Sequence, residues 1–123
     1  MPPLLLRSSG EWDRLSDGGI ALGMFEQSTY KTGQLTIQPD ELVAIYSDGV
    51  TEAENASGRP FDENGLESTL AANRSLPLSA LGASVVRAVE QHSVDTRLAD
   101  DLTILLLKRT PAVAGVSPVL TLL

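Results

Sequence analysis

Two sets of acidic residues stand at the ends of apolar runs in this chain. Asp48-Gly49 follows the run 42–46, and Asp100-Asp101 precedes the run 102–107. If these runs are neighbouring strands, the carboxylates converge, and at ~4 Å and an effective dielectric of ~20 each pair repels by about 4 kcal/mol. Such acids are protonated, splayed apart or neutralised by a cation. Because carboxylate oxygens suit hard cations, we predict a divalent metal site.

The apolar runs predict the strands that would position these acids. Residues 42–46 and 102–107 are continuously apolar and do not alternate, which is typical of strands covered on both faces. Gly49 permits a sharp turn that a residue with a Cβ would resist. We therefore expect the Asp48 carboxylate at the rim of the sheet.

Each acidic signal also has a simpler interpretation. An Asp-Gly pair is a common turn, and two acids before a strand can form a solvated loop. The metal interpretation is favoured because each acidic set adjoins an apolar strand. Arg59, in the polar loop 55–60, is the cation close to the Asp48 motif in sequence and a candidate contact for a phosphate. A solvated loop arginine is the alternative.

The rest of the chain predicts further strands and two helices. Residues 4–6 and 11–15 suggest a hairpin, and a strand at 30–37 would turn at 38–41 into the run 42–46. Asp62 can cap a helix in which Leu66 and Leu70 share a face. Pro77 suits the first turn of a second helix, whose stripe contains Leu81, Val85, Ala88, Val89 and His92. His92, the only histidine, is expected to be structural or solvated.

Composition limits the class of protein. The 123 residues, 42% of them hydrophobic, allow one domain with a real core. A net charge of −7 argues against binding nucleic acid or an anionic membrane. The absence of cysteine excludes thiol nucleophiles and thiolate metal sites, and is compatible with a cytoplasmic location. No apolar run approaches eighteen residues, so we expect no membrane span, and residues 1–6 are too short for a signal sequence.

The stretch Tyr46-Ser47-Asp48-Gly49-Val50-Thr51-Glu52-Ala53, followed by Asp100-Asp101-Leu102-Thr103, resembles the metal-dependent serine/threonine protein phosphatases of the PPM (2C-like) family. It is most similar to the bacterial branch typified by sporulation stage II protein E. The segments 2–7 and 19–23 stand in the same order as in that branch, so the resemblance covers roughly residues 2–109. Family members usually carry glycine-aspartate where this chain has Asp40-Glu41.

The resemblance implies an α+β fold. It corresponds to the C-terminal part of a layered α-β-β-α sandwich, with mostly antiparallel strands and two helices on one face. The domain would comprise residues 1–109, and residues 110–123 would be an apolar, proline-containing tail.

The resemblance also implies hydrolysis of phosphoserine or phosphothreonine in a protein by a metal-activated water. The family uses two Mn²⁺ or Mg²⁺ ions. Its pattern places metal ligation at Asp48-Gly49 and Asp100, and Asp101 stands where other branches carry asparagine. The chain has no cysteine and no G-x-S-x-G motif, which favours water as the nucleophile. The usual substrate in this branch is a phosphorylated anti-sigma factor antagonist.

The family's earlier half is not found in these 123 residues. That half carries an aspartate-glycine pair whose carboxylate bridges the two metals. We therefore expect at most one weakly bound ion and little phosphatase activity from this chain alone. The alternative is a non-catalytic remnant that binds a partner, or binds metal weakly. Because two helices can cover only one face of a sheet, we also predict a homodimer or higher oligomer.

Overall fold

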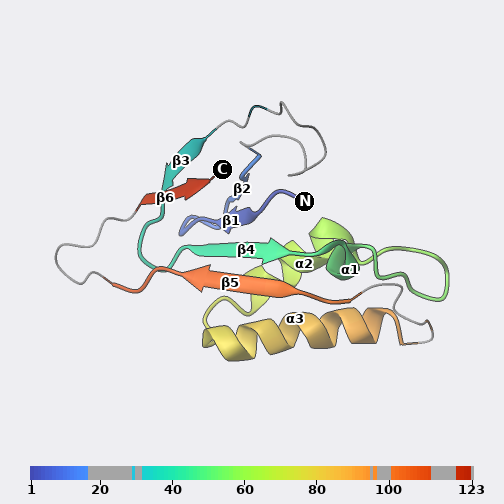
Figure 1. The fold of residues 1–123 in the computed structure, drawn as a ribbon. Helices are drawn as coiled ribbons and strands as arrows, with labels where there is room; N and C mark the ends of the chain where they lie inside the picture. The colour runs from blue at the N-terminus through green and yellow to red at the C-terminus, as the bar shows by residue number, and fades with distance from the viewer. Residues whose placement is uncertain (17–28, 30–31, 95, 97–100, 112–118, 123) are drawn as a thin grey trace. The chain divides into compact units, whose positions relative to one another are not determined.

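The computed structural model describes residues 1–16, 29, 32–94, 96, 101–111 and 119–122. The segment 19–23, Tyr30 and Asp100 lie outside these residues. The chain forms two compact units, one of residues 43–107 with Met1 and one of residues 2–42 with 108–123. Helices and strands are both present (Figure 1), which confirms the α+β class. None of the helices in the described ranges is long and apolar enough to cross a membrane.

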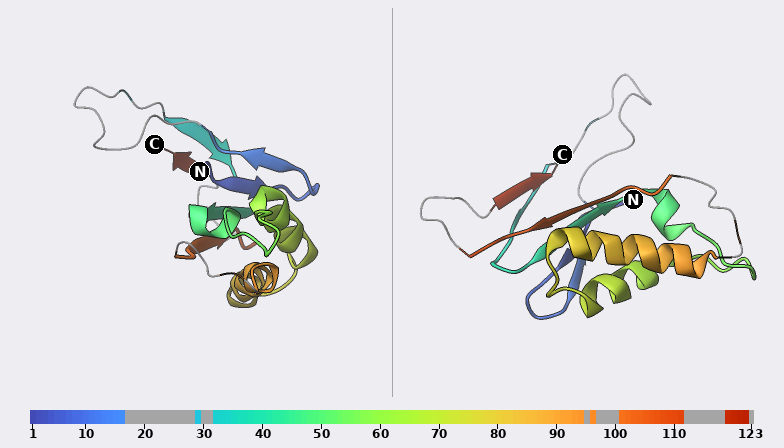
Figure 2. Two further views of the ribbon diagram at one scale, coloured as in Figure 1. Left: turned by 90° about the vertical axis from the view of Figure 1, so that its right-hand side faces the viewer. Right: turned by 90° about the horizontal axis from the view of Figure 1, so that it is seen from below.

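The first unit is built on two neighbouring strands, β4 (Leu42–Tyr46) and β5 (Ile104–Lys108). The two strands run in opposite directions (Figure 1). Helices α2 (Asp62–Ala72) and α3 (Leu78–His92) contact each other and lie on one side of the strand pair (Figure 2). The short helix α1 (Asp48–Thr51) follows β4 directly. The helices bury Leu66, Leu70, Leu81, Val85 and Val89.

Both long helices begin where the sequence predicts. The Asp62 side chain accepts a hydrogen bond from the backbone N–H of Gly65 at 3.1 Å, which satisfies a donor of the first turn of α2. Pro77 precedes α3, and its carbonyl accepts the N–H of Leu81 at 2.9 Å. Leucines four residues apart then face the core from α2, as the spacing predicts.

Within the single chain, β5 is covered on one face only, as the prediction that two helices cover one face of the sheet requires. Its side chains alternate between half-buried and exposed, and Leu105 and Leu107 are 53% and 41% exposed. In β4, Ile45 is 38% exposed while Val43 is fully buried. The helices cover one face of the strand pair (Figure 2), and Ile45, Leu105 and Leu107 remain accessible.

The second unit contains two antiparallel strand pairs. Strands β1 (Leu4–Leu6) and β2 (Trp12–Arg14) form the predicted hairpin, with Leu4 opposite Arg14. Strand β3 (Gly33–Thr36) pairs with β6 (Val119–Leu122). The sequence predicts an apolar tail over residues 110–123, but residues 119–122 of this segment supply a strand.

A tight turn leads from β3 towards β4. The N–H of Glu41 donates to the carbonyl of Gln38 at 3.2 Å, and Pro39 takes the second position of the turn, as predicted. Asp40 has φ +65°, the left-handed conformation that the third position of a type II turn requires. This geometry explains why glycine would suit the position of Asp40.

Glu41 is the centre of a buried polar cluster, although its residue type is usually found at the surface. It is only 3% exposed, and its carboxylate accepts hydrogen bonds from the N–H of Gln38 (2.8 Å), the N–H of Ser8 (3.2 Å) and the guanidinium of Arg7 (3.1 Å). Arg7 also pairs with Asp13 at 2.7 Å. We call these five residues the Glu41 cluster.

The Glu41 cluster holds its carboxylate in the charged form. Burial alone raises the pKa of Glu41, because it disfavours the anion. The backbone donors of Gln38 and Ser8, with the charge and hydrogen bond of Arg7, outweigh that effect and bring the pKa below its ordinary value. The cluster therefore stabilises the turn as a charged, fully bonded unit.

Candidate functional site

Asp48 lies where β4 gives way to α1. Ser47 is extended (φ −89°, ψ 164°), and the next residue begins a single helical turn in which the N–H of Glu52 donates to the carbonyl of Asp48 at 2.8 Å. Asp48 is exposed, so its carboxylate lies at the surface beyond the end of β4. The prediction that Asp48 lies at the rim of the sheet therefore agrees with its location.

The prediction that the chain turns after β4 because Gly49 has no Cβ is wrong. Gly49 is a buried residue of α1, and its φ is not among the positive values found in the described residues. The positive-φ glycines there are Gly10 and Gly58. The chain reverses after β4 through a helical turn, with the N–H of Val50 donating to the carbonyl of Ser47 at 3.0 Å.

Ser47 joins the end of β4 to the segment that precedes β5. Its N–H donates to the carbonyl of Thr103 at 3.0 Å. Its hydroxyl accepts the N–H of Thr103 at 3.0 Å and donates to the carbonyl of Asp101 at 3.1 Å. We call these three bonds the Ser47 clamp. The clamp holds the backbone at the end of β4 against the backbone that precedes β5. Asp48 and Asp101 therefore lie at the same end of the strand pair.

The structure brings together only part of the predicted metal-binding set. Asp48 and Asp101 are both exposed at this end, whereas Asp100 lies outside the described residues. Among the residues that are described, no three acidic or histidine side chains gather closely enough to hold a metal ion. Two exposed carboxylates are nevertheless the correct donor type for a hard cation that keeps several waters. The donor chemistry of these two carboxylates fits Mn²⁺ or Mg²⁺.

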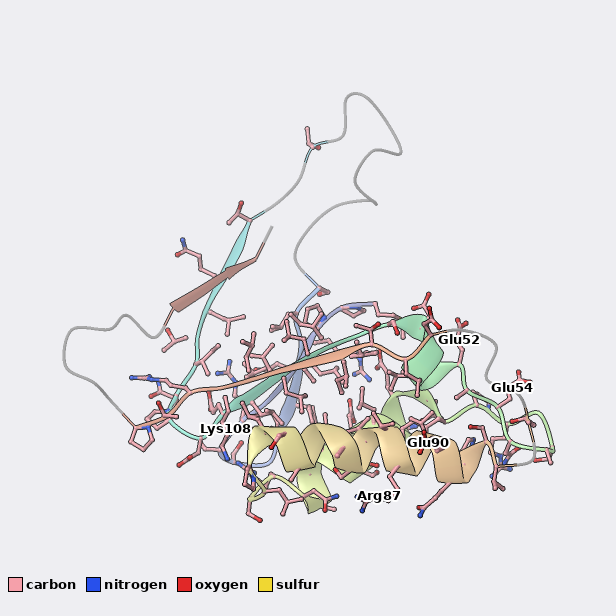
Figure 3. The ribbon with its side chains drawn as sticks, turned by 60° about the horizontal axis from the view of Figure 1, so that its bottom comes forward. Glu52, Glu54, Arg87, Glu90 and Lys108 are labelled. Atoms are coloured by element: carbon pink, nitrogen blue, oxygen red, sulfur yellow. The ribbon has the colours of Figure 1, made fainter. Side chains whose placement is uncertain are left out.

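Glu52 is an acidic residue of this region that the sequence interpretation did not single out. It follows Asp48 by four residues across α1, so the two carboxylates lie on one side of the helical turn. Glu52 is exposed, and Figure 3 shows it at the end of α1, with Glu54 further along the chain. The spacing is visible in the sequence, but it is informative only once a helical turn is known to begin at Asp48.

Arg59 lies in a loop whose backbone is well fixed. The Asn55 side chain accepts the N–H groups of Ser57 and Arg59, both at 3.0 Å. The carbonyl of Arg59 accepts the N–H of Asn55 at 3.0 Å and lies 2.8 Å from Nε2 of His92. The His92 ring also makes an edge contact with Phe61, with centroids 5.6 Å apart. These contacts agree with the structural role expected for His92, while Arg59 itself is exposed.

Comparison with known proteins identifies the family. Residues 1–110 match the family of stage II sporulation protein E. A curated relative, Protein IcfG of a Synechocystis species, is 39% identical over 72 residues. That alignment covers 58% of this chain and only 11% of the relative, and no solved structure matches the chain. Because the family match includes nearly the whole sequence, the chain belongs to the stage II sporulation protein E family of PPM-type phosphatases.

Proposed function

We propose that this chain provides one side of the metal site of a phosphoserine/phosphothreonine protein phosphatase. The observation that carries the proposal is the Ser47 clamp. It ties the residue before Asp48 to Asp101 and Thr103, so two acidic stretches that are far apart in sequence meet at one end of the strand pair. In a chain of this family, that arrangement supports a metal-dependent hydrolase.

The proposed roles follow from the type and exposure of each residue. Asp48 and Asp100 would hold one Mn²⁺ or Mg²⁺ ion, and Asp101 would contribute to the negative charge around it. When bound, such an ion lowers the pKa of its water and offsets charge on the phosphoryl group. Exposed carboxylates leave the site open to a phosphate carried by another protein. Arg59, exposed on a rigid loop, would contact that phosphate.

The proposed substrate is a phosphorylated protein. The resemblance favours a phosphorylated anti-sigma factor antagonist. The two-metal chemistry of the family needs ions about 3.5–4 Å apart, held by a bridging carboxylate. These 123 residues lack the aspartate-glycine pair that serves this purpose in the family. We therefore propose that the chain alone binds at most one ion, weakly, and hydrolyses p-nitrophenyl phosphate far more slowly than complete phosphatases do.

Calorimetric titration with Mn²⁺ tests the metal assignment. We expect a weak binding heat from the wild type that is lost in Asp48→Asn, because the substitution removes a charged ligand without changing the size of the side chain. Glu90→Gln is the control, since Glu90 is an exposed carboxylate on α3. Equal heats from the wild type and Asp48→Asn would contradict the assignment.

A Mn²⁺-dependent activity assay tests the catalytic expectation separately. A rate typical of complete phosphatases that is lost in Asp48→Ala would show that these residues suffice for turnover, and would refute the proposed low activity. Rates that are near background in both proteins, together with Mn²⁺ binding by the wild type, support the proposal.

A partner-binding role is the second candidate, and the exposed face of the strand pair favours it. Ile45, Leu105 and Leu107 are large apolar side chains that remain accessible. Exposed apolar patches of this kind mark interaction surfaces. We propose that this face mediates a homodimer or higher oligomer. Sedimentation equilibrium across a dilution series should detect association of the wild type and its loss in a Leu105→Ser/Leu107→Ser variant. A wild-type monomer at every concentration would refute this role.

A further inference from the structure

We propose that Ser47 is a positioning residue for the metal-binding end of the strand pair, and that its hydroxyl sets the affinity for the cation. This inference rests on the proposed function, because it assumes that the acids near residues 48 and 101 bind the ion. It adds a role for a residue that carries no metal ligand itself.

The geometry of the Ser47 hydroxyl carries the inference. It accepts one hydrogen bond, from the N–H of Thr103, and donates one, to the carbonyl of Asp101. A strand pair needs only backbone bonds for its register, and Ser47 already supplies one through its own N–H. The hydroxyl adds two further hydrogen bonds. Both join Ser47 to the segment before β5, which contains Asp101.

The bond to Asp101 is the one that matters for the ligands. The carbonyl of Asp101 belongs to the same residue as one of the two carboxylates described at this end of the strand pair. Fixing that carbonyl limits the backbone rotations of Asp101, and with them the directions that its carboxylate can take. Residues that orient metal ligands through hydrogen bonds typically change metal affinity by about 10–100-fold when they are removed.

A purely structural role for Ser47 makes a different prediction. If the hydroxyl served only to stabilise the fold, its loss would lower the melting temperature but leave the Mn²⁺ affinity of the folded protein unchanged. If it positions ligands, the affinity falls in protein that is still folded. Metal affinity is therefore the measurement that separates the two roles.

The experiment is a Mn²⁺ titration by calorimetry of the wild type, Ser47→Ala, Ser47→Thr and Ser47→Val. Thr and Val have nearly the same shape, and the extended backbone at residue 47 accepts both. We expect Ser47→Thr to keep the wild-type affinity, and Ser47→Ala and Ser47→Val to bind about 10-fold more weakly. Ser84→Ala is the control, because it removes a hydroxyl that bonds only within α3.

Hydrogen exchange of the Thr103 amide in metal-free protein supplies an independent readout. That amide should exchange faster in Ser47→Val than in Ser47→Thr, because only the latter retains the hydroxyl acceptor. If Ser47→Val binds Mn²⁺ as tightly as Ser47→Thr, the positioning role is overturned while the proposed function stands. If the wild type binds no Mn²⁺, the metal assignment itself fails, and the positioning role fails with it.

Discussion

The Glu41 cluster and the acidic end of the strand pair place carboxylates in opposite environments, one buried and one exposed to solvent. Glu41 is buried and its oxygens are occupied by donors of the protein itself. Asp48 is exposed just beyond the end of β4. The comparison shows that an acid next to an apolar strand has no fixed role. A carboxylate surrounded by the protein's own donors stabilises the fold, whereas the exposed carboxylate of Asp48 lies where a ligand from solution can reach it.

The largest effect we predict is on the free energy of unfolding. It distinguishes the Glu41 cluster from the acidic end of the strand pair. Glu41→Ala should lower the free energy of unfolding by about 3 kcal/mol, because it leaves two backbone donors without their acceptor and removes one of the two carboxylates that pair with Arg7. We take the lower end of the range for a broken buried pair, since the Arg7 side chain is 30% exposed. Urea denaturation measures the change.

The matched control is Asp48→Ala in metal-free protein. As a surface substitution, it should change the free energy of unfolding by no more than about 0.5 kcal/mol. If Glu41→Ala and Asp48→Ala lowered the free energy of unfolding equally, the distinction between the two regions would be wrong. The exposed acid would then have the same structural role as the buried one.

Acid should weaken the fold through Glu41. Its pKa is lowered in the folded state, so the unfolded chain binds the proton more readily, and stability rises with pH across that range. The contribution is complete above the ordinary glutamate pKa of about 4.5 and is lost as the pH falls through the folded value. Urea denaturation at a series of pH values, from about 6 down to about 3, tests this because the series crosses the ordinary glutamate pKa.

The variant Glu41→Gln supplies the comparison for the acid effect. It removes the titrating group, so its stability should depend less on pH than that of the wild type. Parallel pH profiles for the two proteins would show that other carboxylates cause the acid sensitivity.

A smaller effect is expected at the turn that carries Glu41. Asp40→Gly should raise the free energy of unfolding by up to about 1 kcal/mol, because glycine adopts a positive φ without steric cost. Asp40→Ala should lower it, since alanine meets the same clash and lacks the short polar side chain that eases this conformation. Thermal unfolding of the two variants gives the comparison, and destabilisation by glycine would refute this account of the turn.

The sequence predicted the elements whose signal is local. Strands β1, β2 and β4 follow from short apolar or alternating runs, and the apolar spacing of α2 and α3 identified their buried faces. The acid at residue 48 was assigned to the strand end from the same kind of pattern. In each case the periodicity of neighbouring residues carries the information.

The features that were missed depend on partners distant in sequence. The pairing of β6 with β3 joins segments more than eighty residues apart, and no local pattern specifies it. The burial of Glu41 depends on Arg7 and Ser8, which lie in another hairpin. The Ser47 clamp likewise required knowing that Asp101 lies beside the end of β4.

Paramagnetic line broadening by Mn²⁺ tests the central claim most directly, because the effect falls steeply with distance from the ion. At substoichiometric Mn²⁺, we predict that the backbone amide signals of Asp48, Asp101 and Thr103 broaden together, while that of Glu41 stays sharp. That result would locate the ion at the end of the strand pair that the Ser47 clamp assembles. Broadening spread evenly over the exposed acids of the chain, or absent at Asp48, would contradict the account.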